Sequence, residues 1–483
     1  MDTSSSQVTK VPLTKETTNM TWKAITLMAF MTVWGFGNVV NGYAYFNGVK
    51  SIVSWVIVFV LYFIPYSLIV GELGSTFKES GAGVSAWIEK TFSKRLAYYA
   101  GWTYWVVHMP YISQKPLNVV IAASWAIYGD KRLSTYNIVH VQIVCIIIFL
   151  CVLAFAQFGV KMVKHFCSVA GMVSIVLSFM FILMAVSAPA IRGTEITVNA
   201  IPQDLASYIP DFNFGYFASF SILIFAVGGC EKISPYVNKM DKPGKDFPKS
   251  IIFMTIMVVV CAVIGTIALA LMFDPLNPPK DMVTNGAYQA FQQLGNWYGV
   301  GDIFVKIYAL SIAITNFAVM ILSIDAPLRI LIESSDEQFI PANLKKQNKH
   351  GTYTNGTIMI TIIVLILLII PLFGIGGVND MVSFLIKLNS VCMPLRYLWV
   401  FLAYFGLKRL LNQKAEYVMT KNALIGKILG AWCFSVTALF CILGMHNNNI
   451  YIMILNVLTP FVLIGLGLIM PYIAKKQREK LQN

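Results

Sequence analysis

Long apolar runs separated by short polar connections follow one another along the whole chain. A bilayer core of about 30 Å is crossed by about 20 apolar helical residues, and runs of that length recur here about twelve times. They predict membrane-spanning helices at 22–45, 51–77, 95–128, 137–158, 160–187, 214–239, 249–273, 301–331, 357–373, 379–405, 425–445 and 451–474. Their continuous apolarity favours helices over the alternating strands of a membrane barrel.

Composition excludes a water-soluble globule and gives no sign of an enzyme. Of the 483 residues 57% are hydrophobic and 12% are charged, whereas a soluble domain has about 25% charged residues. The eight cysteines lie in or at the ends of apolar runs and form no CxxC pair, so neither a disulfide framework nor a metal site is predicted. The chain has no GxxxxGK[ST] motif, and its histidines lack metal-ligand spacing. We therefore expect no catalysis, cofactor or metal.

The net charge of +14 is a topology signal. About 27 of the Lys and Arg residues fall on the side of the predicted spans that holds both termini, and about five fall on the opposite side. The positive-inside rule then places both termini of this multi-pass membrane protein in the cytoplasm. Basic clusters occur only in short inner loops, where they face membrane lipids, so no nucleic-acid surface is predicted.

Glycines interrupt the first and the sixth span at mid-depth. Gly35 and Gly37 flank Phe36, and Gly228 and Gly229 are adjacent in the sixth span. Where a membrane helix breaks, freed N–H groups form a positive pole and freed carbonyl groups a negative one, and glycine lets a ligand approach both closely. An α-amino acid has one carboxylate and one ammonium group to match these poles.

Interrupted helices at corresponding positions of two halves are typical of transporters built from inverted repeats. The predicted organisation is a tail at 1–21, a first repeat at 22–187, a second repeat at 214–405, two further spans within 425–474 and a tail at 475–483. In the connection between the seventh and eighth spans, residues 285–294 look helical. They form either a lid over an outer vestibule or a plain structured loop.

Three ionisable residues within or near the interrupted spans are candidates for coupling. Glu231 beside the sixth-span glycines either carries a proton or fastens the broken helix; alternatively, the span ends there and Glu231 pairs with Lys232 at the interface. His108 and Lys115 lie seven residues apart in the third span, on one face unless Pro110 kinks it. Lys115 either pairs with an acidic residue, serves the coupling step, or is neutral and structural.

Other charged residues are assigned to structural roles. Glu72, near the inner end of the second span, is expected to fasten the inner gate. Arg396 is expected to extend its guanidinium toward the inner surface. Asp325 and Arg329 are four residues apart and predict an ion pair.

Several stretches resemble the amino acid, polyamine and organocation (APC) transporter superfamily. Phe225-Ala-Val-Gly-Gly-Cys-Glu looks like its sixth-span signature, and Gly71-Glu-Leu-Gly, Ala97-Tyr-Tyr-Ala-Gly-Trp and Ala326-Pro-Leu-Arg-Ile agree with it. The resemblance covers at least residues 22–405 and is closest to bacterial permeases of the glutamate/γ-aminobutyrate antiporter group. Some proton-coupled relatives carry a lysine in span five that is absent here, and Lys115 is a candidate to replace it.

The resemblance implies an all-α, twelve-helix, leucine-transporter-like fold with five-plus-five inverted repeats and broken helices 1 and 6. It implies that residues 35–37 take the substrate carboxylate, that the sixth span offers carbonyl groups to the ammonium, and that Phe225 is an outer gate. The expected substrate-binding residues are Gly35, Phe36, Gly37, Phe225, Ala226, Gly228 and Gly229.

We therefore expect secondary active transport of amino acids by alternating access, either as an exchanger or with protons. An amino acid/amine antiporter is an alternative, and a channel or a non-transporting amino acid sensor is an alternative of a different class. Aromatic residues such as Trp105 and Tyr111 favour a neutral substrate slightly, whereas Lys115 favours an acidic one. A homodimer is compatible with all of these.

Overall fold

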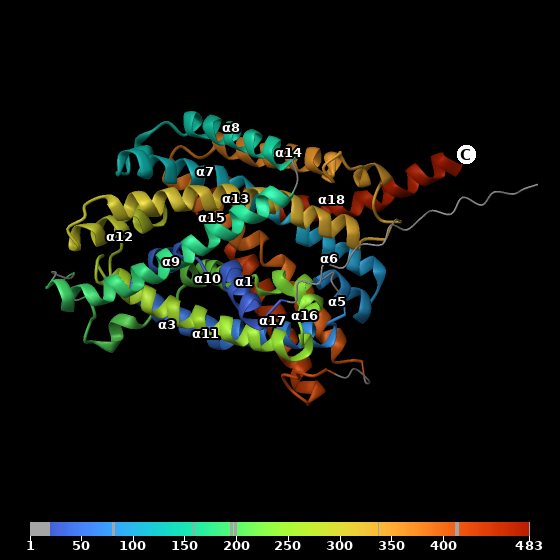
Figure 1. Ribbon diagram of the computed structural model, residues 1–483, viewed down its shortest axis with the longest axis horizontal. Helices are drawn as coiled ribbons and strands as arrows, with labels where there is room; N and C mark the ends of the chain where they lie inside the picture. The colour runs from blue at the N-terminus through green and yellow to red at the C-terminus, as the bar shows by residue number, and fades with distance from the viewer. Residues whose placement is uncertain are drawn as a thin grey trace, which may run out of the picture.

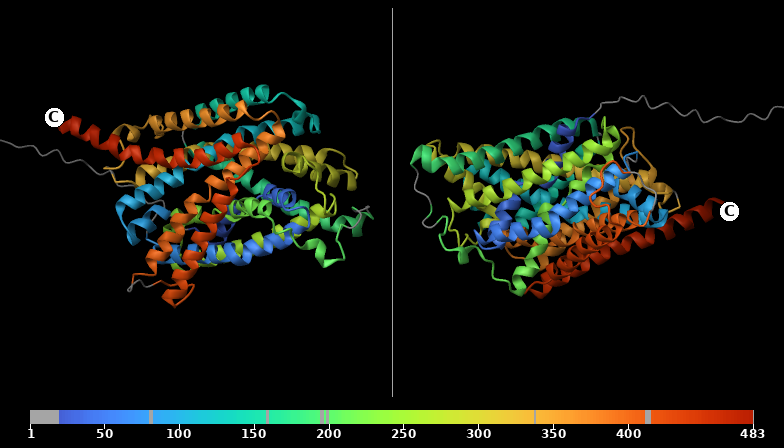
Figure 2. Two further views of the ribbon diagram at one scale, coloured as in Figure 1. Left: turned by 180° about the vertical axis from the view of Figure 1, so that it is seen from behind. Right: turned by 90° about the horizontal axis from the view of Figure 1, so that it is seen from below.

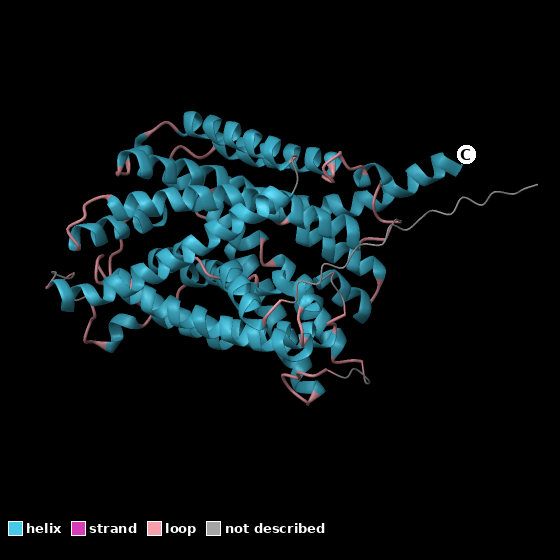
Figure 3. Cartoon of the chain, in the orientation of Figure 1, coloured by secondary structure: helices cyan, strands magenta, loops and turns pink. Residues whose placement is uncertain are grey.

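The computed structural model describes residues 20–79, 83–157, 160–193, 197, 200–336, 338–410 and 415–482. Nearly all of the predicted N-terminal tail, 1–21, lies outside the described residues. Helices joined by short loops make up the described chain, and its β-pairing is confined to two isolated bridges (Figure 3).

The helices of the first half follow the five predicted spans, three of which are interrupted. They are α1 (Trp22–Val33) with α2 (Phe36–Tyr45), α3 (Lys50–Val58) with α4 (Ile64–Thr76) across a π-helical turn (Phe59–Phe63), α6 (Lys94–Val106) with α7 (His108–Tyr128), α8 (Ile138–Ala156) and α9 (Val160–Arg192). A short helix, α5 (Gly83–Thr91), connects the second and third spans.

The second half contains the remaining spans and one further connecting helix, α12 (Met282–Trp297). The spans are α10 (Phe214–Val227) with the 3-10 helix η4 (Cys230–Lys239), α11 (Pro243–Ala270), α13 (Ile303–Ser334), α14 (Thr354–Ile369), α15 (Val378–Cys392) with α16 (Leu395–Leu407), α17 (Ala423–Gly444) and α18 (Ile450–Gln482). Short 3-10 turns lie at Arg132–Thr135, Leu205–Tyr208, Ala342–Lys345 and Ile370–Phe373.

Eleven helical segments of the described chain are long and apolar enough to cross a membrane. They match eleven of the twelve predicted spans. The remaining one, α6 with α7, is not among them because its middle carries polar residues, including His108, Gln114 and Lys115. Large apolar side chains also face outward, as on α8, where Ile143, Ile147 and Leu150 are exposed. A multi-pass membrane protein follows, because such a surface is stable only against lipid.

The bundle has two ends, distinguished by their connecting helices. In Figure 1, α12 lies at the left, and α5 and the end of α18 lie at the right; Figure 2 shows the long α18 ribbon reaching this second end in both further views. We call them the α12 end and the α5 end. The helix predicted within 285–294 is confirmed as part of α12, whose Met282 and Phe291 are fully buried.

Buried apolar side chains form two core clusters. The larger runs through most of the helices, from Phe30 of α1 to parts of α7 and α13, where Trp125 and Tyr308 belong to it. The smaller joins α6, the first turns of α7 and parts of α8, α13 and α14, for example through Trp105 and Met320. In Figure 1 the helices α7, α8, α13 and α14 lie above α1, α3, α10 and α11.

Candidate functional site

The first span breaks at the predicted glycines. Trp34 and Gly35 are extended between α1 and α2, and Gly35 caps α2 without a side-chain hydrogen bond. The Asn38 N–H donates to the carbonyl oxygen of Gly35 over 2.9 Å. The N–H groups of Phe36 and Gly37 open the helix, where N–H groups have no partner within the helix. A Cβ on Gly37 would have no neighbour within 4 Å, so there is open space beside this turn.

The sixth span breaks at Gly228 and Gly229, between α10 and η4. Gly229 has a φ of 117°, in the left-handed region that favours glycine. A Cβ on Gly228 would lie 2.0 Å from the hydroxyl oxygen of Tyr397, so only glycine fits between α10 and α16. The glycine pair that the sequence singled out therefore forms a real interruption.

The two breaks lie against each other. The Asn38 Nδ2 atom donates to the carbonyl oxygen of Ala226 over 3.2 Å, and the Thr32 hydroxyl donates to the carbonyl oxygen of Gly229 over 3.4 Å. The carbonyl oxygen of Gly229 also accepts from the Lys232 N–H over 3.0 Å. A second lone pair is therefore left for another donor on the Ala226 oxygen rather than on that of Gly229. The predicted substrate-binding residues of the two spans are therefore close neighbours.

The two predicted aromatic residues differ in their surroundings. Phe36 turns its ring into an aromatic cluster, with ring centroids 4.5 Å from Phe181 and 5.8 Å from Phe291 of α12. Only its backbone is placed to meet a substrate at the break. Phe225 is partly exposed on α10, which leaves its predicted gating role a hypothesis.

Glu231 is buried and paired with Arg396, which corrects two expectations. Their side chains are 0% and 1% exposed, and Glu231 Oε1 lies 3.1 Å from Arg396 Nε, without the alignment of a hydrogen bond. The Tyr66 hydroxyl donates to the other carboxylate oxygen. An interfacial Glu231 paired with Lys232 is thus wrong, and so is an Arg396 that extends to the inner surface. The carboxylate balances the guanidinium within the bundle, so neither needs water.

His108 joins the same network. Its Nε2 atom lies 3.2 Å from Arg396 Nη1, and its Nδ1 atom lies 2.6 Å from the carbonyl oxygen of Tyr104. Guanidinium nitrogens only donate, so Nε2 accepts and Nδ1 carries the proton. From these partners we assign a neutral imidazole that positions Arg396 beside the sixth-span break.

Lys115 and Lys232 share an aromatic ring. The Lys115 ammonium lies 4.0 Å from the centroid of Tyr111, and that of Lys232 lies 5.7 Å from it. Among the ion pairs of the described residues, neither lysine has a carboxylate partner. The hypothesis that Lys115 pairs with an acidic residue of the chain is therefore wrong for the described part.

Comparison with known proteins identifies the family. Residues 20–420 match the amino acid permease family. The chain belongs to this family. It is 44% identical to the aspartate/glutamate permease AcaP of Lactococcus lactis over 476 residues. The alignment covers 96% of this permease and 97% of that relative.

More distant relatives are also transporters. The permease is 25% identical over 445 residues to a glutamate/gamma-aminobutyrate antiporter of Lactococcus lactis, covering 87% of this chain and 83% of the relative. It is 22% identical over 433 residues to the inner membrane transporter YjeM of Escherichia coli, covering 83% and 84%. The resemblance noted in the sequence is confirmed, and the permease is a transporter rather than an enzyme.

Glu72 lies at the α5 end of the permease, in what we call the Glu72 clasp. Its carboxylate is 3% exposed and accepts hydrogen bonds from Lys408, from the Tyr404 hydroxyl over 2.9 Å and from the Met419 N–H over 3.1 Å. Lys408 also donates to the carbonyl oxygen of Thr420 over 3.1 Å. The clasp ties α4 to α16 and to the segment at 415–422, which is the geometry expected of a fastened gate.

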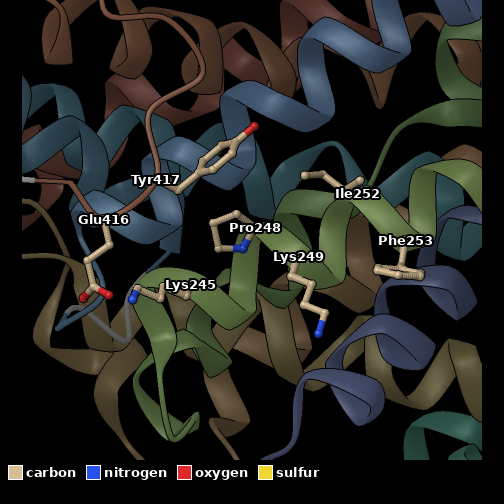
Figure 4. A pocket seen from close by; sticks show the side chains of 7 residues that line it. All are labelled: Lys245, Pro248, Lys249, Ile252, Phe253, Glu416 and Tyr417. Atoms are coloured by element: carbon tan, nitrogen blue, oxygen red, sulfur yellow. The ribbon is translucent and has the colours of Figure 1, made fainter.

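Two cavities are lined by residues other than the glycines of the breaks. One of about 300 Å³ opens at the first turns of α11 (Figure 4), and its lining residues are Lys245, Pro248, Lys249, Ile252, Phe253, Glu416 and Tyr417. A second, of about 10 Å³, lies between α5 and η4 and is lined in part by Glu231 and Ser234. It has room for about one water molecule beside the sixth-span break.

Several contributors escaped sequence reasoning. Tyr66, Tyr397 and Lys408 come from helices remote in sequence, and nothing in their own segments marks them. Asn38 had a usable signal, because a polar side chain directly after a glycine pair in a membrane span needs a partner. The predicted pair of Asp325 and Arg329 is confirmed, with 3.3 Å between Oδ1 and Nη2.

Proposed function

We propose that this permease carries acidic amino acids across a bacterial cytoplasmic membrane by alternating access, with both termini in the cytoplasm. One observation carries the proposal: the broken first and sixth spans meet, with the N–H groups that open α2 at one break and the Ala226 carbonyl group, which has one donor, at the other. These are the opposite poles that an amino acid backbone requires.

The acidic class is supported by a relative and by charge. The relative that is 44% identical over nearly the whole chain is named an aspartate/glutamate permease. Three cationic side chains lie near the breaks, those of Arg396, Lys115 and Lys232. Within the described chain, only Arg396 among them forms an ion pair with a carboxylate, that of Glu231. An anionic substrate fits this surplus of positive charge.

Alternating access is supported by the family and by the contact between the two broken spans. Transporters built on broken helices move one part of the bundle against the other around a fixed site. The Glu72 clasp would then fasten the inner gate.

In this proposal the permease either exchanges one amino acid for another or takes up an amino acid together with a proton. Exchange of an acidic amino acid for its decarboxylation product is a second candidate, favoured by the relative named a glutamate/gamma-aminobutyrate antiporter. Counterflow compared with uptake into empty proteoliposomes under a pH gradient separates these mechanisms, because exchange needs a preloaded substrate and proton symport responds to the gradient.

The decisive experiment is counterflow in proteoliposomes against the twenty amino acids and their amines, with Gly37→Ala as the test variant. The added methyl group enters the open space beside the α2 amides, so we expect aspartate counterflow to fall about tenfold or more with folding retained. Gly465→Ala is the matched control, because that helical glycine also has no neighbour within 4 Å and lies on α18. Equal counterflow in both variants would contradict a site at the first break.

A further inference from the structure

We propose that Lys115 and Lys232 form the subsite for the side-chain carboxylate of the substrate, with Tyr111 holding the two ammonium groups in place. This inference rests on the proposed transport function and adds the residues that select the substrate. The backbone groups at the two breaks recognise any α-amino acid, so selection needs other residues.

The two lysines reach the same place from different elements. Tyr111 and Lys115 are four residues apart on α7 and therefore share a helix face. Lys232 belongs to η4 and directly follows the break, and its Cε atom lies 3.8 Å from where a Cβ on Gly229 would be. The side chain of Lys232 therefore lies next to the sixth-span break, and the Tyr111 ring brings the Lys115 ammonium near it.

Neither lysine forms an ion pair with a carboxylate among the described residues. Glu231 precedes Lys232 in sequence, but its carboxylate contacts Arg396 and Tyr66 and its side chain is 0% exposed. A contact with an aromatic ring stabilises an ammonium group by less than burial of that ion costs. A carboxylate between the two ammonium groups supplies the missing charge, and a neutral side chain leaves them to repel each other.

The two lysines can bind a substrate carboxylate, whereas Arg396 is already occupied by other partners. Arg396 is already engaged by Glu231, His108 and the Tyr397 hydroxyl, the last at 3.2 Å. The ammonium of Lys232 belongs to a partly exposed side chain, and Lys115 is 9% exposed. Two ammonium groups can each donate to one oxygen of a carboxylate, in the strong charge-assisted hydrogen bonds that such pairs form.

The test compares an acid with its amide of nearly the same shape. Lys115→Met and Lys232→Met keep the aliphatic stems and remove the charges, and Lys387→Met is the control, a half-buried lysine on α15. We expect the ratio of aspartate to asparagine counterflow to fall about tenfold or more in each test variant and to stay unchanged in the control. Lys115→Arg retains the charge and is expected to keep most of the ratio.

An unchanged ratio in both test variants would overturn the lysine subsite, whereas aspartate counterflow by the unaltered protein would still uphold the proposed function. Absence of counterflow by any acidic amino acid in the unaltered protein would contradict that function itself. If the variants fail to fold, the rate at which an amine-reactive isocyanate labels lysines of the unaltered protein tests the subsite instead. We expect aspartate, but not asparagine, to slow labelling of Lys232, and equal labelling rates would overturn the subsite.

Discussion

Two buried glutamates anchor this permease, and their surroundings differ in one respect. Glu72 at the α5 end faces Lys408 and the Tyr404 hydroxyl, and Glu231 at the sixth-span break faces Arg396 and the Tyr66 hydroxyl. The Glu72 clasp is balanced, with one carboxylate and one ammonium group. The Glu231 site lies beside two further cations, which share the Tyr111 ring.

The difference separates fastening from binding. A balanced pair with its hydrogen bonds satisfied is sufficient to hold helices together, as the clasp shows. The additional lysines beside the break are not needed for that purpose and carry the cost of buried charge, which a bound anion removes. Variants that upset the two sites should therefore differ in whether they damage stability or selectivity.

The largest loss of stability is expected at the Glu231 site. Arg396→Leu leaves Glu231 buried without its cation, and removal of one partner of a buried pair costs about 3–5 kcal/mol. The thermal unfolding midpoint of the protein in detergent should fall sharply. The double variant Arg396→Leu with Glu231→Leu should recover much of the loss, because no isolated charge remains. If the single variant Arg396→Leu unfolded at the same temperature as the unaltered protein, the pair would not stabilise the break.

A smaller loss is expected where Tyr397 packs on the break. In Gly228→Ala the new methyl group meets the Tyr397 hydroxyl, and overpacking of this kind costs about 1–3 kcal/mol. A Cβ there would also lie 2.2 Å from Tyr397 Cζ, so the matched double variant is Gly228→Ala with Tyr397→Ala, which removes the ring. It should lose less stability than the sum of the two single variants. If the single variant were as stable as the unaltered protein, the close approach of α10 to α16 would be refuted.

The clasp should respond more mildly. Glu72→Gln keeps acceptors for Tyr404 and the Met419 N–H but loses the charge opposite Lys408, so a cost of about 1–3 kcal/mol is expected. Trypsin cleavage after Lys421 should become faster as the segment at 415–422 loosens. An aspartate to asparagine counterflow ratio that fell along with stability would erase the distinction between clasp and binding site.

The smallest effect is expected at the exposed pair of Lys78 and Glu416. A hydrogen bond from Lys78 lowers the pKa of Glu416 below its ordinary value. A lowered carboxyl pKa adds stability above the unfolded pKa of about 4.3 and loses it as the pH falls through the folded value. Lys78→Gln should therefore unfold like the unaltered protein between pH 7 and pH 5, since surface pairs contribute little. A clear loss at pH 7 in unfolding scans would contradict this.

Much of the fold was readable from sequence because its signals are local. Apolar runs marked eleven spans that the structure contains, and Gly228 with Gly229 marked the sixth-span break. The third span was predicted from the same runs, but its polar middle, with His108 and Lys115, leaves its crossing of the membrane a prediction.

The pairings at the site were not readable, because they join residues far apart in sequence. Arg396 lies near the inner end of a predicted span, where long cations commonly extend to water, and only the position of Glu231, 165 residues earlier in the chain, shows otherwise. The ring of Phe36 was expected to line the substrate site, but the helix rotation of α2 turns it toward Phe291 and the α12 end. Likewise, the meeting of Lys115 with Lys232 depends on how η4 resumes after the break.

Counterflow of labelled aspartate into proteoliposomes of the purified permease tests the central claim most directly. The account predicts accumulation when the liposomes contain unlabelled aspartate or glutamate, and much less when they contain asparagine or leucine. Accumulation that no amino acid or amine stimulates would contradict it.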